Sequence, residues 1–387
     1  MLGQRVFLVA AEPSGDAVAA DLVKALREER PELVFAGMGG PKMAALGIET
    51  CVSIEGLSIL GLTEALGIWK LVREKVGQVA QAAAQFRPDV VVLIDSWGFT
   101  VRAAQAIRKL LPGIPLVKMI GPQVFATRPG RAKSVAKNYD ALFCIHDFEV
   151  PFYDGLGIPI TVIGNPAVAR AKTGDGDAFR DRHGLADKHI GLLLPGSRRA
   201  EIDLVSPTFE AAARQLSELY PDLIFVTVLA PAVEALVRER AKYWQFSHIL
   251  VGESEKEDAF KAAKFALACS GTVTTEVALQ GTPMIVGYRL GKVTAFIILN
   301  FMLKSRFVTL VNIALNEEIV PEYIQNKFTP DVVVAAASRL LDDPAAYQRQ
   351  VTLLDRALAK MGRDDPPMAK RAATALLKLL DGDRSHN

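Results

Sequence analysis

Cysteine and histidine are scarce in this chain of 387 residues, and neither is clustered. The three cysteines, Cys51, Cys144 and Cys269, are odd in number, far apart and set among apolar residues. That distribution is typical of buried, reduced thiols and argues against a disulfide framework. The five histidines form no pair at metal-ligand spacing. The sequence therefore predicts no required metal ion and no other cofactor.

The chain also lacks an excess of charge of one sign, because 45 Lys and Arg residues nearly balance 43 Asp and Glu residues. This balance argues against a nucleic-acid binder that works by general phosphate neutralisation. No stretch reaches the roughly 18 to 20 uninterrupted apolar residues of a membrane span. The apolar run 6–11 is too short for a signal-peptide core and ends at Glu12, so we expect a cytoplasmic protein.

One short segment, residues 294–303, is very apolar and is bracketed by Lys292, Lys304 and Arg306. An apolar stretch flanked by cations suits a helix that lies in a membrane interface or lines a lipid pocket. A buried helix between two domains is the alternative interpretation.

Most of the chain alternates short aliphatic runs with helical patterns, which predicts parallel sheets covered by helices on both faces. The predicted strands of a first domain are residues 5–11, 33–37, 90–94, 115–120, 141–145 and 161–163. Those of a second are residues 189–194, 223–229, 248–251, 265–269 and 283–286. The expected fold is α/β, with two Rossmann-like, doubly wound domains facing a cleft.

A breaker-rich stretch around residues 164–177 marks the expected boundary between the two domains. We therefore predict an acceptor or catalytic domain over residues 1–165, a nucleotide-sugar domain over 166–345 and a helical tail over 346–387. The tail is expected to pack back on the first domain. Ligands of parallel sheets bind beyond the carboxyl ends of the strands, so these ends were searched for chemistry.

The first strand of the second domain runs into residues 193–201, which read LLPGSRRAE. Gly196 suits a tight turn, Ser197 offers a hydroxyl and free amides at a helix start, and Arg198 adds a bidentate donor. These groups together predict a diphosphate site. The alternative is a plain turn with an exposed capping arginine.

A second strand end, residues 268–276, reads ACSGTVTTE. Ser270, Gly271 and Thr272 can bind phosphate oxygens, and Glu276, one turn along the helix, can accept hydrogen bonds from ribose hydroxyls. An ordinary capped helix is the alternative. The sequence has neither a P-loop motif nor GxGxxG in its first strand-to-helix turn, so the nucleotide is expected in the second domain.

Candidate catalytic residues lie in the first domain. Glu12, Ser14 and Asp16 crowd the turn after the first strand, and Asp95 follows the apolar run 90–94. A carboxylate that emerges from a buried strand into a cleft suits a general base for a sugar hydroxyl. Capping of the helices that follow is the alternative for Asp16 and for Asp95.

Several motifs in combination resemble the lipid-A-disaccharide synthase family, over residues 6 to at least 325. They are GMGGPKM at 37–43, EPSGD at 12–16, LPGSRRAE at 194–201, SGTVTTE at 270–276, VGYR at 286–289, Asn312 and VPEYIQ at 320–325. Two regions depart from the family pattern. Gly121, Phe125 and Thr127 stand where the family usually has Ser and two Trp residues, and Thr100 stands where it commonly has Asn.

The resemblance implies a metal-independent, inverting glycosyltransferase of the B-type fold. It would join UDP-2,3-diacylglucosamine to 2,3-diacylglucosamine 1-phosphate, release UDP and act as a peripheral protein on the cytoplasmic face of the inner membrane. The nucleotide side would include Arg198, Ser270, Gly271, Thr272, Glu276 and Asn312, and the reacting-sugar side Glu12, Ser14, Asp16 and Asp95. The alternatives are a UDP-sugar 2-epimerase and a catalytically silent, membrane-associated nucleotide-sugar binder. The oligomeric state stays open, a homodimer included.

Overall fold

The computed structural model describes residues 3–55, 65–125, 128–169, 172–291 and 305–382. The apolar segment 294–303 and Thr127 lie outside the described residues. The chain divides into two compact units, of which the first contains residues 1–166 and 365–387 and the second residues 167–364. Each unit is a parallel sheet with helices on both faces, so the predicted fold class is confirmed.

The first unit is built around a sheet whose described strands are β1 (Arg5–Ala10), β2 (Val34–Gly39), β3 (Glu49–Ser53), β4 (Val90–Ile94), β5 (Leu116–Met119), β6 (Ala141–Cys144) and β7 (Ile160–Val162). Their order is β3-β2-β1-β4-β5-β6-β7. The helices of this unit are α1 (Pro13–Glu29), α2 (Pro41–Ala44), α3 (Ala65–Phe86), α4 (Trp97–Leu110), α5 (Arg131–Asn138), the 3-10 helix η1 (Asp147–Tyr153) and α16 (Met368–Leu380).

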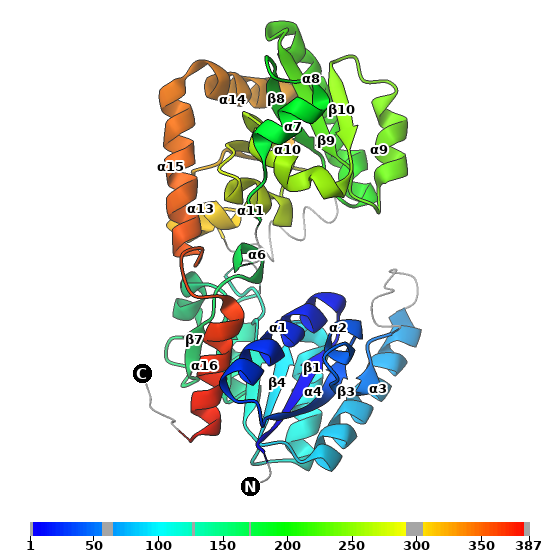
Figure 1. The fold of residues 1–387 in the computed structure, drawn as a ribbon, viewed down its shortest axis with the longest axis vertical. Helices are drawn as coiled ribbons and strands as arrows, with labels where there is room; N and C mark the ends of the chain where they lie inside the picture. The colour runs from blue at the N-terminus through cyan, green and yellow to red at the C-terminus, as the bar shows by residue number, and fades with distance from the viewer. Residues whose placement is uncertain (1–2, 56–64, 126–127, 170–171, 292–304, 383–387) are drawn as a thin grey trace. The chain divides into compact units, whose positions relative to one another are not determined.

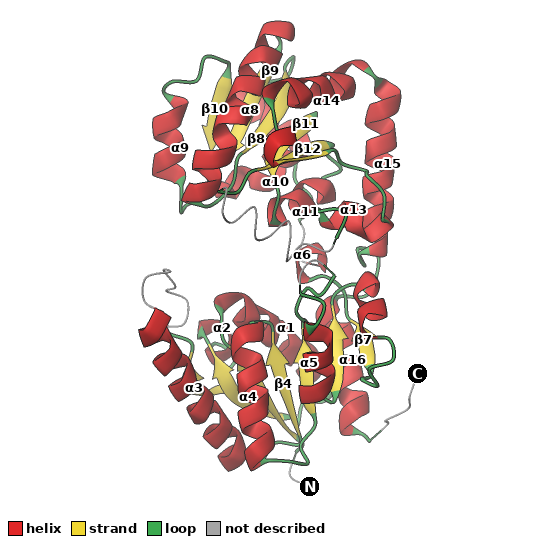
Figure 2. Cartoon of the chain, turned by 180° about the vertical axis from the view of Figure 1, so that it is seen from behind, coloured by secondary structure: helices red, strands yellow, loops and turns green. Residues whose placement is uncertain are grey.

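Alternate residues of β1 feed two apolar cores, because successive side chains of a strand point to opposite faces of the sheet. Val6 and Leu8 pack in one core with α1 and α16, which lie side by side in Figure 1. Phe7 and Val9 pack in the other core with α3 and α4, which cover the face seen in Figure 2. Burial on both faces explains why the central strands are continuous apolar runs.

The second unit has described strands β8 (His189–Leu194), β9 (Leu223–Val228), β10 (His248–Val251), β11 (Phe265–Cys269), β12 (Met284–Tyr288) and β13 (Glu322–Ile324), in the order β10-β9-β8-β11-β12-β13. Its helices are α7 (Gly176–His183), α8 (Arg199–Leu219), α9 (Glu234–Ala241), η2 (Glu253–Glu255), α10 (Lys256–Ala262), α11 (Thr272–Leu279), α13 (Leu310–Leu315), η4 (Gln325–Lys327), α14 (Pro330–Asp342) and α15 (Pro344–Lys360). The short helix α6 (Pro166–Ala169) lies at the boundary of the units. One sheet face packs against α8 and α14, and α10 and α11 contact the other.

The C-terminal tail differs from the prediction in where it returns to the first unit. The helix α15 packs against α11, α13 and α14 and so belongs to the second unit. Only α16 packs on the first unit, against α1, where Leu376 is fully buried. The boundary between the two units falls between Asp364 and Asp365, in the connection from Lys360 to Met368 that joins the two helices.

Two strands, β3 and β13, were not predicted. Both are edge strands, and neither is a continuous apolar run: β3 alternates exposed and buried residues, and β13 has only three half-buried ones. No helix of the described residues is long and apolar enough to cross a bilayer.

Candidate functional site

Each sheet has a switch point where chain connections leave neighbouring strands in opposite directions. In the first sheet it lies between β1 and β4, and in the second between β8 and β11. Open α/β sheets bind ligands at such points, beyond the carboxyl ends of the strands. The loops at the first switch point carry Glu12, Ser14 and Asp95, and those at the second carry Arg198 and Ser270. The structure therefore places these five candidate residues at the two switch points, and Asn312, beside the edge strand β13, lies apart from them.

The turn after β1 leaves two candidate side chains exposed. Glu12 is the N-cap residue of α1 and Ser14 lies in its first turn, and both are solvent-exposed. Gly15 is buried where a Cβ atom would lie 3.4 Å from the Cβ of Ala10. Glu12 and Ser14 are thus available to a ligand at the first switch point.

Asp16 was predicted to be a catalytic residue, and the structure gives it a different task. Its carboxylate is 1% exposed and accepts three backbone N–H bonds, from Gly40 (2.9 Å), Lys42 (2.9 Å) and Met43 (3.1 Å). Both oxygens are therefore occupied at the start of α2. Gly40 itself has no side chain with which to cap α2, and a Cβ atom there would lie 2.8 Å from Asp16 Oδ2. Asp16 is a structural residue that caps α2 from α1.

Asp95 follows β4 directly and begins a sharp turn into α4. Its φ of 49° and the φ of 37° at Ser96 are both left-handed. The backbone N–H of Asp95 donates to Met119 O at 2.9 Å, which ties the turn to β5. The half-buried carboxylate accepts no hydrogen bond from any described residue. Among the predicted carboxylates near β1 and β4, Asp95 and Glu12 keep their oxygens available.

The turn after β8 shows one departure from prediction. The amides of Ser197 and Arg198, expected to be free, donate to Glu201 Oε2 at 2.9 and 3.2 Å. Gly196 has a φ of 130°, and a Cβ atom there would lie 2.5 Å from the Cβ of Glu201, so only glycine fits. The Arg198 side chain pairs with Glu201 at 3.1 Å but stays 80% exposed. At this turn the Arg198 guanidinium and the Ser197 hydroxyl are the groups still available to an anion.

The turn after β11 presents small residues ahead of α11. Gly271 and Thr272 are exposed at the start of the helix, and Ser270 is half-buried. Glu276, one turn further, accepts a hydrogen bond from Lys256 Nζ at 3.0 Å. Sequence analysis did not find Lys256, because it lies 20 residues from its partner on another helix.

Asn312 was placed on the nucleotide side, and the structure buries it completely. Its Oδ1 accepts the N–H groups of Ile319 and Val320, and its Nδ2 donates to Val320 O and to Glu322 Oε1. All four bonds are made within the chain, so no hydrogen-bonding group of Asn312 is left for a ligand. It is a structural residue that fixes the connection between α13 and β13.

The loop that carries Gly121 and Phe125, two of the positions that depart from the family pattern, packs against the rings of Phe148 and His146. The Phe125 ring lies 5.0 Å from Phe148, which stacks on His146 at 4.5 Å. Burial lowers the pKa of His146 to about 4, so the ring is neutral at physiological pH. At Gly121 a Cβ atom would lie 3.3 Å from the Tyr153 hydroxyl, a buried group that has no hydrogen-bond partner among the described residues. Thr127 lies outside the described residues.

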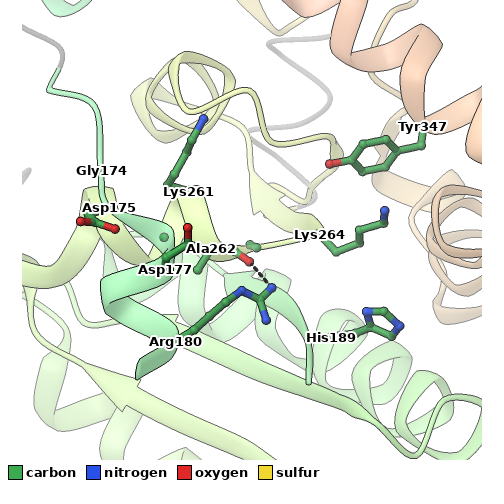
Figure 3. Close-up of a pocket in the computed structure, with 11 residues that line it drawn as sticks. Gly174, Asp175, Asp177, Arg180, His189, Lys261, Ala262, Lys264 and Tyr347 are labelled. Atoms are coloured by element: carbon green, nitrogen blue, oxygen red, sulfur yellow. Dashed lines mark hydrogen bonds between the residues drawn. The ribbon is translucent and has the colours of Figure 1, made fainter. Parts of the chain in front are cut away.

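A pocket of about 520 Å³ lies at the end of the second sheet opposite the switch point (Figure 3). Its lining includes His189, the first residue of β8, and Lys264, which precedes β11, so it is at the amino ends of the strands. Arg180 donates to Ala262 O, and Lys264 Nζ lies 4.0 Å from the Tyr347 ring centroid. The pocket is therefore distinct from the switch point. Among the described residues, no group of three or more His, Cys, Asp or Glu side chains could hold a metal ion.

Two doubly wound units, each with polar loops at its switch point, define the class of fold: that of the B-type glycosyltransferases and the UDP-sugar epimerases that share it. S. aureus MnaA, in a co-structure with UDP, has a TM-score of 0.64 at 17% identity, over 98% of this chain and 97% of that one. The UDP-GlcNAc 2-epimerase of Neisseria meningitidis has a TM-score of 0.60 at 13% identity, over 99% and 100% of the two chains. At these identities the likeness shows the fold.

The sequence comparisons are more specific. The model of the lipid-A-disaccharide synthetase family matches residues 6–374. The lipid-A-disaccharide synthase of Rhodospirillum centenum is 40% identical over 379 residues, 97% of this chain and 94% of that protein. That of Myxococcus xanthus is 34% identical over 383 residues, 98% of each chain. The chain belongs to the lipid-A-disaccharide synthetase family and is a glycosyltransferase.

Proposed function

We propose that this chain joins UDP-2,3-diacylglucosamine to 2,3-diacylglucosamine 1-phosphate and releases UDP. The observation that carries the proposal is the family match over residues 6–374, combined with a half-buried Asp95 carboxylate at a switch point that accepts no hydrogen bond from the residues the structure describes. The family match supports the two substrates, and Asp95 supports the chemistry at the reacting hydroxyl.

The second unit would bind the UDP part of the donor. Exposed Arg198 offers a bidentate donor to the diphosphate, and the residues from Ser270 to Thr272 offer hydroxyl and amide groups at the neighbouring strand end. Glu276, held by Lys256, would accept hydrogen bonds from the ribose hydroxyls. These fixed donors would stabilise the charge that develops on the leaving diphosphate.

The first unit would activate the acceptor. Asp95 would take the proton of the acceptor 6-hydroxyl as that oxygen forms a bond to the anomeric carbon of the donor. The bond from this carbon to the diphosphate oxygen breaks, UDP leaves with the bonding electrons, and the anomeric configuration inverts. Glu12 and Ser14 would bind sugar hydroxyls near the reacting centre.

The proposal is tested with the acylated donor and acceptor, and the product is detected by mass spectrometry. Asp95→Ala should lower kcat by at least ~10²-fold, the usual cost of losing a general base. Its UDP affinity should stay within twofold of wild type. Arg198→Ala should weaken UDP binding by about tenfold, a loss of roughly 1.4 kcal/mol. Arg199→Ala is the matched control, because that side chain is equally exposed, at 79%. Near-normal turnover of Asp95→Ala would exclude the base role.

A UDP-sugar 2-epimerase is the second candidate, because epimerases share this fold. It needs no acyl chains, so conversion of an unacylated UDP-sugar to its epimer would support it and contradict transfer. UDP binding with no product from either substrate set would indicate a catalytically silent binder.

We also propose that transfer needs no metal ion. We further propose that it takes place at the cytoplasmic face of the inner membrane, because both proposed substrates carry acyl chains. Activity should survive excess chelator, and a loss restored by added Mg²⁺ would contradict this. Co-sedimentation with anionic vesicles should fall when Phe296, Ile297 and Phe301 are replaced by Ser. Wild-type vesicle binding by that folded variant would remove the segment 294–303 from the proposal.

A further inference from the structure

The strand β5 carries one charged side chain, Lys118, and it is fully buried. Its neighbours Val117 and Met119 are apolar and pack in the sheet core. An ammonium group removed from water costs several kcal/mol unless its hydrogens and charge are matched. The fold has no need of a charge at this position, so the partners of Lys118 indicate what it does.

The Lys118 ammonium has three acceptors for its three hydrogens. It donates to the backbone oxygen of Asp95, to Thr100 Oγ1 at 3.1 Å and to the backbone oxygen of Leu93 at 3.4 Å. Burial lowers the pKa of Lys118 to about 7, and the charge of Asp95 opposes this shift. The lysine is therefore directed entirely at the end of β4 and the turn that follows it.

That turn is sterically unfavourable. Asp95 and Ser96 both have left-handed φ angles, which are unfavourable for residues with a Cβ atom. The Thr100 hydroxyl lies 2.9 Å from Asp95 O and 3.2 Å from Ser96 O and so closes the turn from the first turn of α4. With Lys118 on the other side, the Asp95 carbonyl is held from β5 and from α4.

We propose that Lys118 is a positioning residue, which fixes the backbone of Asp95 so that its carboxylate faces the acceptor hydroxyl. The inference rests on the proposed function, in which Asp95 is the general base. Lys118 has no exposed surface and does not touch a substrate, so it acts through the turn alone.

The test begins with Lys118→Met, which keeps an unbranched side chain and removes the ammonium. Because its removal takes one donor from Leu93 O, Asp95 O and Thr100 Oγ1, the variant should unfold at a somewhat lower urea concentration than wild type and still be folded without urea. Its kcat should fall by about tenfold or more, since small errors in geometry are costly in catalysis. KM for the donor and UDP affinity should stay within twofold of wild type. Lys109→Met, at an exposed position on α4, is the control and should leave all four quantities unchanged.

A double variant separates positioning from a general structural role. If Lys118 acts through Asp95, Lys118→Met combined with Asp95→Ala should be no slower than Asp95→Ala alone. If the double variant lost kcat by the product of the two single losses, the proposal would be overturned. A wild-type kcat in folded Lys118→Met would also overturn it. Thr100→Val and Thr100→Ser give the same test from α4 if Lys118→Met does not fold. Thr100→Ser should keep kcat and Thr100→Val should lose it, and equal activity would overturn the proposal.

Hydrogen exchange gives a readout that does not depend on activity. The amides of Asp95 and Thr100, bonded to Met119 O and Ser96 O, should exchange at least tenfold faster in Lys118→Met or Thr100→Val. Exchange within β1 should stay unchanged. Unchanged exchange at Asp95 would overturn the proposal. Full activity in Asp95→Ala, together with faster exchange in Lys118→Met, would instead contradict the base role of Asp95 and leave the lysine holding the turn.

Discussion

Asp16 gives a sharp test of whether a motif carboxylate is structural or catalytic. Its oxygens accept three backbone N–H groups at the start of α2, and hydrogen bonds to a charged group contribute about 1.5 to 3 kcal/mol each. In Asp16→Ala, the partly buried amides of Gly40 and Lys42 can donate hydrogen bonds to water instead. The buried amide of Met43 is left without an acceptor. We therefore expect a loss of about 3 kcal/mol in the unfolding free energy of the first unit, well below the sum of three bonds.

Asp16→Asn is the matched variant. The amides of Gly40 and Met43 both donate to Oδ1, which an asparagine carbonyl can replace, and only the bond from Lys42 to Oδ2 is lost. The expected loss is about 1 to 2 kcal/mol. A catalytic carboxylate would show the opposite pattern, with little loss of stability in either variant and a large loss of turnover in both.

The assay must report on the first unit alone, because a chain of two units does not unfold in one step. The sequence has three tryptophans, of which Trp69 and Trp97 are in the first unit and Trp244 in the second. In a Trp244→Phe background, tryptophan fluorescence during urea unfolding reports the first unit. A change below 1 kcal/mol for Asp16→Ala, with turnover reduced ~10²-fold at a temperature where the protein is folded, would refute the structural assignment.

Three further outcomes follow from the contacts. Burial raises the pKa of Glu149 from 4.5 to about 7, so the folded state binds more protons and the chain loses stability as pH rises from about 4.5 through 7. Glu149→Gln should therefore be more stable than wild type by about 1 to 3 kcal/mol at pH 8 in urea unfolding, with the gap closing near pH 5. Glu276→Ala should weaken UDP binding about tenfold in calorimetry, since ribose hydroxyls lose an acceptor, whereas Lys256→Met leaves that acceptor in place and should weaken it less. Leu376→Ala should cost the first unit about 3 kcal/mol because it empties a buried site, whereas Asp381→Ala, which breaks an exposed ion pair with Arg30, should leave the urea midpoint nearly unchanged.

The fold was readable from the sequence wherever strands are buried on both faces. Central strands such as β4 and β8 are continuous aliphatic runs, and their predicted bounds agree with the structure. The strands β3 and β13 escaped because charged and polar residues interrupt them, whereas the other two edge strands, β7 and β10, are mostly aliphatic and were predicted. The sequence predicted that a C-terminal helical tail packs on the first unit, but it placed the start of that tail at residue 346, before α15. Periodicity shows that α15 is amphipathic, but it does not show which unit the apolar face of α15 contacts.

The site was less predictable, because a motif gives the type of a residue and not the direction of its side chain. Asp16 and Asn312 belong to motifs of the family, yet their side-chain oxygens accept backbone N–H groups 7 to 27 residues away. Glu201 likewise occupies the amides expected to bind phosphate. The sequence signal at Lys118 was a lysine inside an otherwise aliphatic strand, which was interpreted only as part of a buried strand.

The structure also shows how two residues together hold the turn at Asp95. Thr100 stands where the family commonly has Asn, and its hydroxyl donates to Asp95 O, the carbonyl that Lys118 also approaches from β5. A hydroxyl accepts one bond from the ammonium while donating its own hydrogen to Asp95 O or Ser96 O. Threonine and buried lysine thus form one connected group, and neither has its full set of partners without the other. The effect of a substitution at Thr100 should therefore depend on whether Lys118 is present. A double-mutant cycle should show strong coupling between the two positions.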